Sequence, residues 1–191
     1  TAGFSVSSIS GSTTETGGTA TFTVRLNSEP TANVSIGVTS SDTGEGTVSP
    51  SSLTFTSSNW NANQTVTVTG VNDNVADGDQ SYTIVLAAAN SSDSDYSGLN
   101  PVDVTVTNTD DETAGFTVSS ISGSTTEAGG TATFTVKLNS QPTANVTIGV
   151  SSSDTGEGTV SPSSLTFTSA NWNANQTVTV TGVNDSSADG N

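Results

Sequence analysis

The sequence predicts an all-β protein made of tandem antiparallel β-sandwiches, each of about seven strands. The first observation behind this prediction is a long internal repeat, in which residues 113–191 match residues 1–79 at all but 10 of 79 aligned positions. The second is a strict alternation of apolar and polar residues, and the third is the absence of any helical period longer than one turn. A fixed long period is typical of a chain assembled from copies of one structural unit.

The strands of the first copy follow from this alternation, which marks strands with one buried face. Residues 4–6 read Phe-Ser-Val, and residues 19–26 place Ala20, Phe22, Val24 and Leu26 on one face. The later segments show the same period and are rich in the β-branched residues Thr and Val, which suit a pleated surface. The remaining expected strands, in chain order, are residues 33–38, 53–55, 65–69, 82–86 and 102–106.

Turn-forming residues separate these strands. Seven short strands in one period of 112 residues are typical of an immunoglobulin-like sandwich, although the Cys…Trp…Cys pattern of antibody domains is missing. We therefore expect a complete repeat at residues 1–112 and a second repeat at 113–191 that lacks its last two strands. The inner faces of this second repeat should then be more open. The simplest interpretation is a window from a longer array, and strand exchange between chains is the alternative.

The composition excludes several classes of function. Lys plus Arg is 2 and Asp plus Glu is 18, so the net charge is −16, which disfavours nucleic acid and anionic lipid as partners and favours cations. The sequence has no His and no Cys, which leaves no common ligand for zinc or copper and no thiol chemistry. No apolar stretch reaches the roughly 20 residues of a membrane-spanning helix. With only Arg25 and Lys137 as basic side chains, we expect no enzymatic activity.

Carboxylates concentrate in three segments that a sandwich brings to one pole. Asp73, Asp77 and Asp79 follow the strand that ends near residue 71, residues 110–112 read Asp-Asp-Glu after the last strand, and Glu15 lies in the loop before Gly17. So many like charges are compatible only when a cation is bound between them, and oxygen ligands in flexible loops suit Ca²⁺. The alternative interpretation is that these residues are solvated turn formers.

Two strings resemble the Calx-β domain family, which occurs in sodium–calcium exchangers, in an integrin subunit and in very large bacterial surface proteins. They are Thr-Gly-Val-Asn-Asp-Asn-Val-Ala-Asp-Gly-Asp-Gln-Ser-Tyr at 69–82 and Val-Thr-Asn-Thr-Asp-Asp-Glu-Thr-Ala-Gly-Phe at 106–116. The Thr- and Ser-rich style is similar to that of the bacterial surface members. The resemblance implies Calx-β-type sandwiches that bind Ca²⁺ through Glu15, Asp73, the carbonyl of Val75, Asp77, Asp110, Asp111 and Glu112.

The chain departs from the family pattern at several positions. Asn72 and Gln80 stand where the family often has acids, and residues 46–50 replace a segment that carries one ligand. These departures imply one or two ions held with modest affinity. In the second repeat Glu127, Asp185 and Asp189 persist without an acidic tail, so we expect that site to be empty or poorly formed. Asp42, Glu45 and their copies Asp154 and Glu157 are interpreted as turn residues.

The predicted function is that of a structural segment of an extracellular stalk or adhesin at the cell surface, with neighbouring repeats as partners and Ca²⁺ stiffening the joint between them. One alternative is a subunit of an extracellular filament or matrix, which would assemble with other copies through strand edges or strand exchange. Another is a carbohydrate-binding module for surface glycans, in which Trp60 would stack on sugar. Trp60 and its copy Trp172 are otherwise interpreted as plugs that close one end of the core.

Overall fold

The computed structural model describes residues 1–186. The chain divides into two compact units, of which unit 1 comprises Thr1–Asp73 and Asp77–Asp111, and unit 2 comprises Asn74–Ala76 and the residues from Glu112 onward. The main boundary therefore falls one residue from the end of the 112-residue period. All regular structure in the described part of the chain is β-strand, as the alternation predicts. No helix there has the length and hydropathy needed to cross a bilayer.

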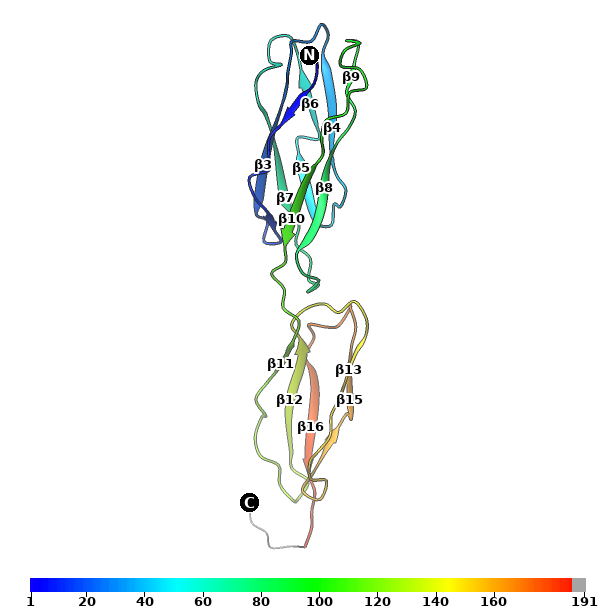
Figure 1. Ribbon diagram of the computed structural model, residues 1–191. Helices are drawn as coiled ribbons and strands as arrows, with labels where there is room; N and C mark the ends of the chain where they lie inside the picture. The colour runs from blue at the N-terminus through cyan, green and yellow to red at the C-terminus, as the bar shows by residue number, and fades with distance from the viewer. Residues whose placement is uncertain (187–191) are drawn as a thin grey trace. The chain divides into compact units, whose positions relative to one another are not determined.

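Unit 1 is a sandwich of two sheets (Figure 1). Its strands are β1 (Phe4–Val6), β2 (Thr13–Thr14), β3 (Thr19–Leu26), β4 (Val34–Ser40), β5 (Gly46–Ser49), β6 (Ser52–Phe55), β7 (Gln64–Gly70), β8 (Gln80–Leu86), β9 (Asn90–Ser91) and β10 (Val104–Thr109). One sheet has the order β1-β3-β7-β5, and the other has the order β2-β10-β8-β4-β6, with β9 also paired to β4. Pairing is antiparallel except between β10 and β2, which run parallel and so depart from the all-antiparallel expectation.

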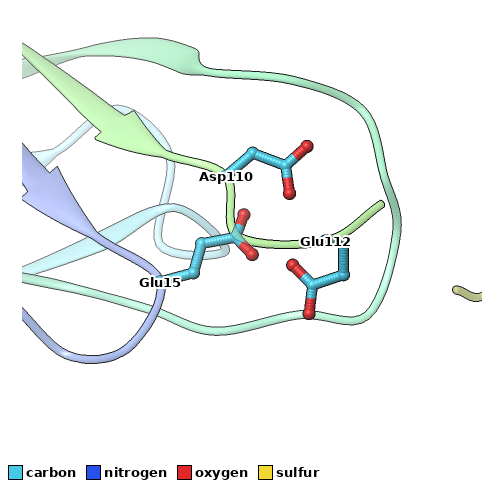
Figure 2. Close-up of side chains that lie close together, drawn as sticks. All are labelled: Glu15, Asp110 and Glu112. Atoms are coloured by element: carbon cyan, nitrogen blue, oxygen red, sulfur yellow. The ribbon is translucent and has the colours of Figure 1, made fainter. Parts of the chain in front are cut away.

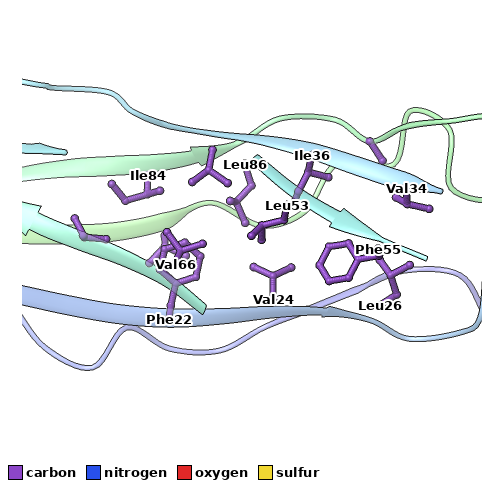
Figure 3. Close-up of a cluster of buried hydrophobic side chains, with 14 of the residues drawn as sticks. Phe22, Val24, Leu26, Val34, Ile36, Leu53, Phe55, Val66, Ile84 and Leu86 are labelled. Carbon is purple, nitrogen blue, oxygen red and sulfur yellow. The ribbon is translucent and has the colours of Figure 1, made fainter. Parts of the chain in front are cut away.

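The core of unit 1 lies between the two sheets and is built from the alternate residues of each strand. Phe22, Val24 and Leu26 of β3 face Leu53 and the other inward side chains of the opposite sheet (Figure 3). Seventeen buried residues form this cluster, which includes Tyr82, Ile84 and Leu86 from β8 and Val104 and Val106 from β10. Because successive side chains of a strand point to opposite faces, the period of two in the sequence is the direct cause of this core.

Three short strands and one strand boundary differ from the sequence-based prediction. β2, β5 and β9 were not expected, because two to four residues rich in Gly, Ser, Thr and Asn show too little alternation to detect. Val102 was expected in the last strand, but β10 begins at Val104 and Val102 is 77% exposed. Asp103 lies just before β10. Its side-chain Oδ1 accepts a hydrogen bond from the Leu86 backbone N–H over 2.8 Å, so a side chain takes the place of backbone pairing between β10 and β8 at this point.

A buried tyrosine between β9 and β10 completes the core. Tyr96 is 1% exposed and makes an edge-to-face contact with Phe4, with ring centroids 6.1 Å apart. Its hydroxyl donates to the Ser28 carbonyl over 2.7 Å and accepts from the Ser28 N–H over 3.1 Å. Asp93 holds the same loop, because its carboxylate accepts from the N–H groups of Thr31 and Asp95. These backbone hydrogen bonds lower the pKa of Asp93.

Unit 2 repeats the first part of unit 1. Its strands are β11 (Phe116–Val118), β12 (Thr131–Leu138), β13 (Val146–Gly149), β14 (Gly158–Ser161), β15 (Ser164–Phe167) and β16 (Gln176–Gly182). Within the described residues these form one sheet of order β11-β12-β16-β14 and a two-stranded sheet β13-β15. The first sheet has the registers of its counterpart in unit 1, so that Phe134 pairs with Val178 as Phe22 pairs with Val66.

The core of unit 2 is correspondingly smaller. Its buried cluster over the described residues has five members: Val136, Leu138, Leu165, Phe167 and Val178. Phe134, Val146 and Ile148 are only half-buried, whereas their counterparts in unit 1 are at most 1% exposed. The expectation of more open inner faces in the second repeat is thus met over its described part.

Candidate metal centre

Glu15 is placed at the end of the sandwich by the parallel pairing of β2 with β10. In this pairing Thr13 and Thr14 lie opposite Asn108 and Thr109, and the Glu15 N–H then donates to the Thr109 carbonyl over 3.1 Å. The side chain of Glu15 is therefore held beside the residues that follow β10. It is only 2% exposed, which is unusual for a carboxylate.

Three carboxylates meet at this position. Glu15, Asp110 and Glu112 each offer an oxygen, and these oxygens all lie within 4.8 Å of one another. Figure 2 shows Glu15 approaching from the loop after β2, and Asp110 and Glu112 from the segment after β10, with the three carboxylates turned toward one another. We call this set the Glu15 group.

A second set of carboxylates involves the loop that follows β7. Glu45, Asp73 and Asp77 also offer oxygens within 4.8 Å of one another, and we call this set the Glu45 group. Its geometry comes from the pairing of β5 with β7, in which Gly46 lies opposite Gly70. The Val71 N–H then donates to the Glu45 carbonyl over 3.0 Å, which brings Glu45 to the start of the loop that carries Asp73 and Asp77.

Hydrogen bonds connect the segments that carry the two groups. Asp110 of the Glu15 group accepts from the Gly78 N–H over 2.6 Å, and its own N–H donates to Asp79 Oδ1 over 3.2 Å. Asn108, which is fully buried, donates from Nδ2 to Glu45 Oε2 over 3.3 Å and to the Val71 carbonyl over 3.0 Å. The two groups thus share one scaffold formed by the end of β10 and the loop after β7.

The electrostatic cost of this arrangement shows in the pKa of Glu45. Burial raises this pKa above its ordinary value, and the negative charges of Asp77, Asp42 and Asp73 raise it further against the lowering effect of the Asn108 hydrogen bond. The pKa of Tyr82 is raised as well, mainly by burial and to a smaller extent by the charge of Glu45. A bound cation would lower both pKa values, because a nearby positive charge favours the ionised form of each group.

The structure brings most of the predicted ligands to one pole but divides them between two groups. Asp111 belongs to neither group and is exposed. Val75 is half-buried in the loop between Asp73 and Asp77, and the role of its carbonyl as a ligand stays a prediction.

Glu45 was missed by the sequence-based prediction. The turn interpretation holds for its neighbour Asp42, whose carboxylate accepts from the Gly44 N–H over 2.9 Å and whose carbonyl accepts from the Gly46 N–H. Glu45 lies in the same turn but also joins Asp73 and Asp77. The signal that could have identified it is the short strand β5, whose register with β7 places Glu45 beside the acidic loop.

The second repeat has the same acidic residues in a different setting. Glu127 and Glu157, the counterparts of Glu15 and Glu45, are exposed, as is Asp185. Among the described residues, Glu127, Glu157 and Asp185 belong to no set of three carboxylates of the kind that the Glu15 and Glu45 groups form. Asp189, which was also predicted to persist in this site, lies outside the described residues. The expectation that the second site is empty or poorly formed stays a prediction.

The tryptophans pack as core plugs. Trp60 is half-buried against the core of unit 1, and its carbonyl accepts from the Leu26 N–H over 2.9 Å. Trp172 packs in the same way in unit 2 and accepts from Leu138. Because both rings pack against the apolar cores, no observation favours the sugar-stacking alternative.

Comparisons with known proteins assign no family. No family model matches the chain, and no curated protein matches it. Among solved structures, the chain is similar to domains 5-6 of the S-layer protein SbsC, at 19% identity and a TM-score of 0.30, over 96% of this chain and 86% of that one. It is also similar to domains 4-9 of the surface layer protein SbsC, at the same identity and TM-score, over 96% of this chain and 27% of that one. The Calx-β assignment therefore stays a prediction.

Proposed function

We propose that the chain is a structural repeat segment of an extracellular surface protein, and that Ca²⁺ bound by the Glu15 and Glu45 groups orders the segment that connects the repeats. The observation that carries this proposal is the convergence of six carboxylates into two groups, one of Glu15, Asp110 and Glu112 and the other of Glu45, Asp73 and Asp77. No catalytic role is part of the proposal, because the sequence offers neither His nor Cys and only two basic side chains.

The chemistry of the donors matches a hard divalent cation. Both groups consist of carboxylate oxygens, and Ca²⁺ takes six to eight oxygen ligands from carboxylates, backbone carbonyls and water at about 2.3–2.6 Å. Two unit charges about 4 Å apart repel by about 4 kcal/mol near a protein surface, so three carboxylates in one place strongly favour binding of a cation. Extracellular modules bind Ca²⁺ at about 10⁻⁴–10⁻³ M, which suits a site with few charges and flexible loops.

The mechanical consequence follows from the positions of Asp110 and Glu112 in the chain. Both lie in the residues that lead from β10 toward β11, whereas Glu15 is anchored by β2 and β10. A cation that contacts all three would hold the start of this connecting segment against the body of unit 1. The Gly78–Asp110 hydrogen bond would extend the restraint to the loop after β7. Fewer conformations of the connection mean a stiffer array, as a stalk requires.

Titration calorimetry and small-angle X-ray scattering test the two parts of this proposal. We expect saturable Ca²⁺ binding to the whole chain, and a narrower distribution of maximum dimensions with Ca²⁺ than with a chelator. The control is Glu127→Gln, which removes an equivalent charge from the second repeat and should change neither result. Absence of Ca²⁺ binding would reject the metal site. Binding without any change in scattering would reject the stiffening role alone.

A further inference from the structure

The loop between β7 and β8 contains an Asp-Gly pair, Asp77-Gly78, which is the only such pair among the described residues. In any polypeptide, the backbone nitrogen that follows an aspartate can attack the side-chain carboxyl of that aspartate and close a five-membered succinimide ring. Glycine in the following position favours this reaction most, because it has no Cβ to shield the nitrogen and its backbone reaches conformations that other residues avoid. The loop therefore carries an intrinsic chemical reactivity.

The surroundings of the pair leave room for the ring to close. Asp77 and Gly78 are both exposed, and residues 71–79 lie outside the strands. Gly78 has a φ of 79°, in the left-handed region, and a Cβ built on it would meet nothing within 4 Å. Water, which is needed to open the ring again, reaches both residues. Neither packing nor burial therefore protects this peptide bond.

Hydrogen bonds provide the protection that packing does not. The Gly78 N–H, whose nitrogen is the nucleophile in ring closure, donates to Asp110 Oδ2 over 2.6 Å, and such a bond to a carboxylate is strong. Gln80 Nε2 donates to the carbonyls of Asp77 and Gly78 over 3.1 and 3.2 Å, so the peptide groups on both sides of Gly78 are held. The nitrogen can attack only after it has lost its proton and turned toward Asp77. Both changes break the bond to Asp110, so this bond opposes ring closure.

The restraint at Asp77 differs from that at two other aspartates of unit 1. Asp42 and Asp93 each use their own carboxylate to accept an N–H two residues further on, from Gly44 and Asp95 respectively. Such a turn holds the carboxylate itself, and the residue that follows each of these aspartates carries a side chain. At Asp77 it is the following N–H that is held, by a residue 32 positions away from Gly78. The protection of this pair therefore depends on the tertiary structure.

We propose that Asp77-Gly78 is a site of spontaneous isomerisation to isoaspartate, and that the hydrogen bond from Gly78 to Asp110 holds this reaction in check. The bond joins the loop after β7 to the segment after β10, so it persists only while these two segments stay together. Each separation of the segments releases the nucleophile. The isoaspartate content at position 77 then records the time that the segments have spent apart.

The reaction needs no partner other than water. In the first step the Gly78 nitrogen bonds to Cγ of Asp77, and one carboxylate oxygen leaves as water with the proton of the nitrogen and a proton from solvent. In the second step water opens the ring. Attack at Cγ restores aspartate, whereas attack at the main-chain carbonyl carbon of Asp77 gives isoaspartate. The succinimide is lighter than the chain by one water, and the final product has the original mass.

The product changes the loop in two ways. The main chain of isoaspartate runs through the former side chain, so the loop gains one backbone atom, and the carboxylate is now attached to Cα. An oxygen of Asp77 lies within 4.8 Å of oxygens of Glu45 and Asp73, and the shift of the carboxylate disrupts this grouping. Isomerisation would therefore weaken Ca²⁺ binding at the Glu45 group. This last consequence alone rests on the proposed function.

Peptide mapping of the whole chain tests the proposal. The chain is incubated in a chelator at neutral pH and physiological temperature, and isoaspartate at position 77 is quantified by electron-transfer fragmentation. Mapping is required because the sequence has a second Asp-Gly pair, Asp189-Gly190, which lies outside the described residues. The same chain unfolded in urea provides the unprotected rate. We expect the folded chain to isomerise at position 77 more slowly than the unfolded chain, by about tenfold or more.

Two matched variants test the role of Asp110. Asp110→Ala removes the acceptor of the Gly78 N–H, and we expect isomerisation at position 77 to be about tenfold faster than in the parent, because a hydrogen bond to a charged group shifts a local equilibrium by about that factor. Asp111→Ala is the control, because it removes the same charge from an exposed residue that belongs to neither carboxylate group, and the rate should not change. Near-ultraviolet circular dichroism checks that both variants are folded.

Asp77→Asn gives a second measurement that leaves Asp110 in place. The Gly78 nitrogen then attacks a carboxamide, ammonia leaves instead of water, and the chain gains mass when the ring opens. We expect deamidation of this variant to be slower in the folded than in the urea-unfolded chain by about the same factor as isomerisation in the parent. The reason is that the same hydrogen bond restrains the same nitrogen.

Three results would overturn the proposal. Absence of isoaspartate at position 77 in the unfolded chain would show that the pair is not reactive. Equal rates in the folded and unfolded parent, matched by equal deamidation rates of Asp77→Asn, would show that the fold does not restrain it. A rate in folded Asp110→Ala no higher than in the parent would show that Asp110 is not the restraint, and a lower rate would make Asp110 the base that accepts the proton. Because every arm contains a chelator, these results do not depend on whether the carboxylate groups bind Ca²⁺.

Discussion

The backbone N–H of Gly78 donates to Asp110 Oδ2 over 2.6 Å, and this hydrogen bond joins the loop after β7 to the segment after β10. The two segments are 32 residues apart in the sequence and carry acidic residues of both carboxylate groups. Their junction makes the pole of unit 1 one structural element rather than two independent acidic loops. The proposed role of calcium depends on this junction.

Replacement of a buried ligand should weaken calcium binding. Glu15→Gln keeps the size of the side chain but removes one of the three charges of the Glu15 group, and we expect a loss of Ca²⁺ affinity on the order of tenfold, equivalent to about 1.4 kcal/mol. Titration calorimetry measures this directly. The matched change Glu127→Gln, in the second repeat, should have no effect, and an equal loss in both variants would contradict the assignment of the site to unit 1.

The raised pKa of Glu45 predicts a specific pH dependence in the absence of calcium. Its folded-state pKa lies above the ordinary value of 4.5, so its contribution to stability is full below pH 4.5 and is lost as the pH rises through the folded pKa. Glu45→Gln mimics the protonated form. We therefore expect this variant to be more stable than the parent at pH 7, by about 0.5 kcal/mol or less after allowance for solvent screening, and equally stable well below pH 4.5.

Urea unfolding in a chelator measures this difference, and Glu157→Gln is the control because Glu157 is exposed. With saturating Ca²⁺ at pH 7 the parent should become more stable than Glu45→Gln, because only the parent then gains the binding energy of an ionised ligand at position 45. A parent that stays less stable than Glu45→Gln under saturating Ca²⁺ would argue against Glu45 as a ligand.

The contact between Gly46 and Tyr82 predicts that the same substitution destabilises the first repeat but hardly affects the second. Gly46→Ala forces a Cβ into the buried Tyr82 ring, which should cost about 1–3 kcal/mol of unfolding free energy. Gly158→Ala meets only ordinary contacts and should stay within about 0.5 kcal/mol of the parent. Thermal unfolding of both variants by calorimetry distinguishes them. Equal destabilisation would show that the general effect of replacing Gly by Ala in a strand, rather than the collision with the Tyr82 ring, sets the cost.

The hydroxyl of Tyr96 should contribute measurably to the stability of unit 1. Tyr96→Phe keeps the edge contact with Phe4 but removes the hydrogen bonds to the N–H and carbonyl of Ser28, and we expect a cost of about 1–2 kcal/mol. Denaturant unfolding measures this cost. Ser28→Ala is the control, because it retains both backbone partners and should cost less than Tyr96→Phe.

The strands that alternate strictly were predictable, and the short ones were not. Phe22, Val24 and Leu26 are buried as their spacing requires, since the pleat alone decides which side chains share a face. β5 has only Gly-Thr-Val-Ser, and its assignment as a strand depends on hydrogen bonds to β7. Such pairing involves residues far apart in the sequence, so a local pattern carries no trace of it.

The residues of the candidate site were likewise predictable only in part. Glu15, Asp110 and Glu112 were expected together because loops at one end of a sandwich share a pole. Asp111 was expected with them, but it is exposed and belongs to neither group. Glu45 was missed for the reason that β5 was missed.

The sequence by itself determined the repeat, the all-β architecture, the inward faces of the long strands and the acidic character of one pole, because each of these depends on composition or on a period of two along the chain. Only the tertiary structure decided that the carboxylates form two groups of three, that Glu45 belongs to one of them and that Tyr82 and Asn108 fill the end of the unit 1 core. Those features depend on the register between distant strands, which is set by the packing of whole sheets rather than by any local segment.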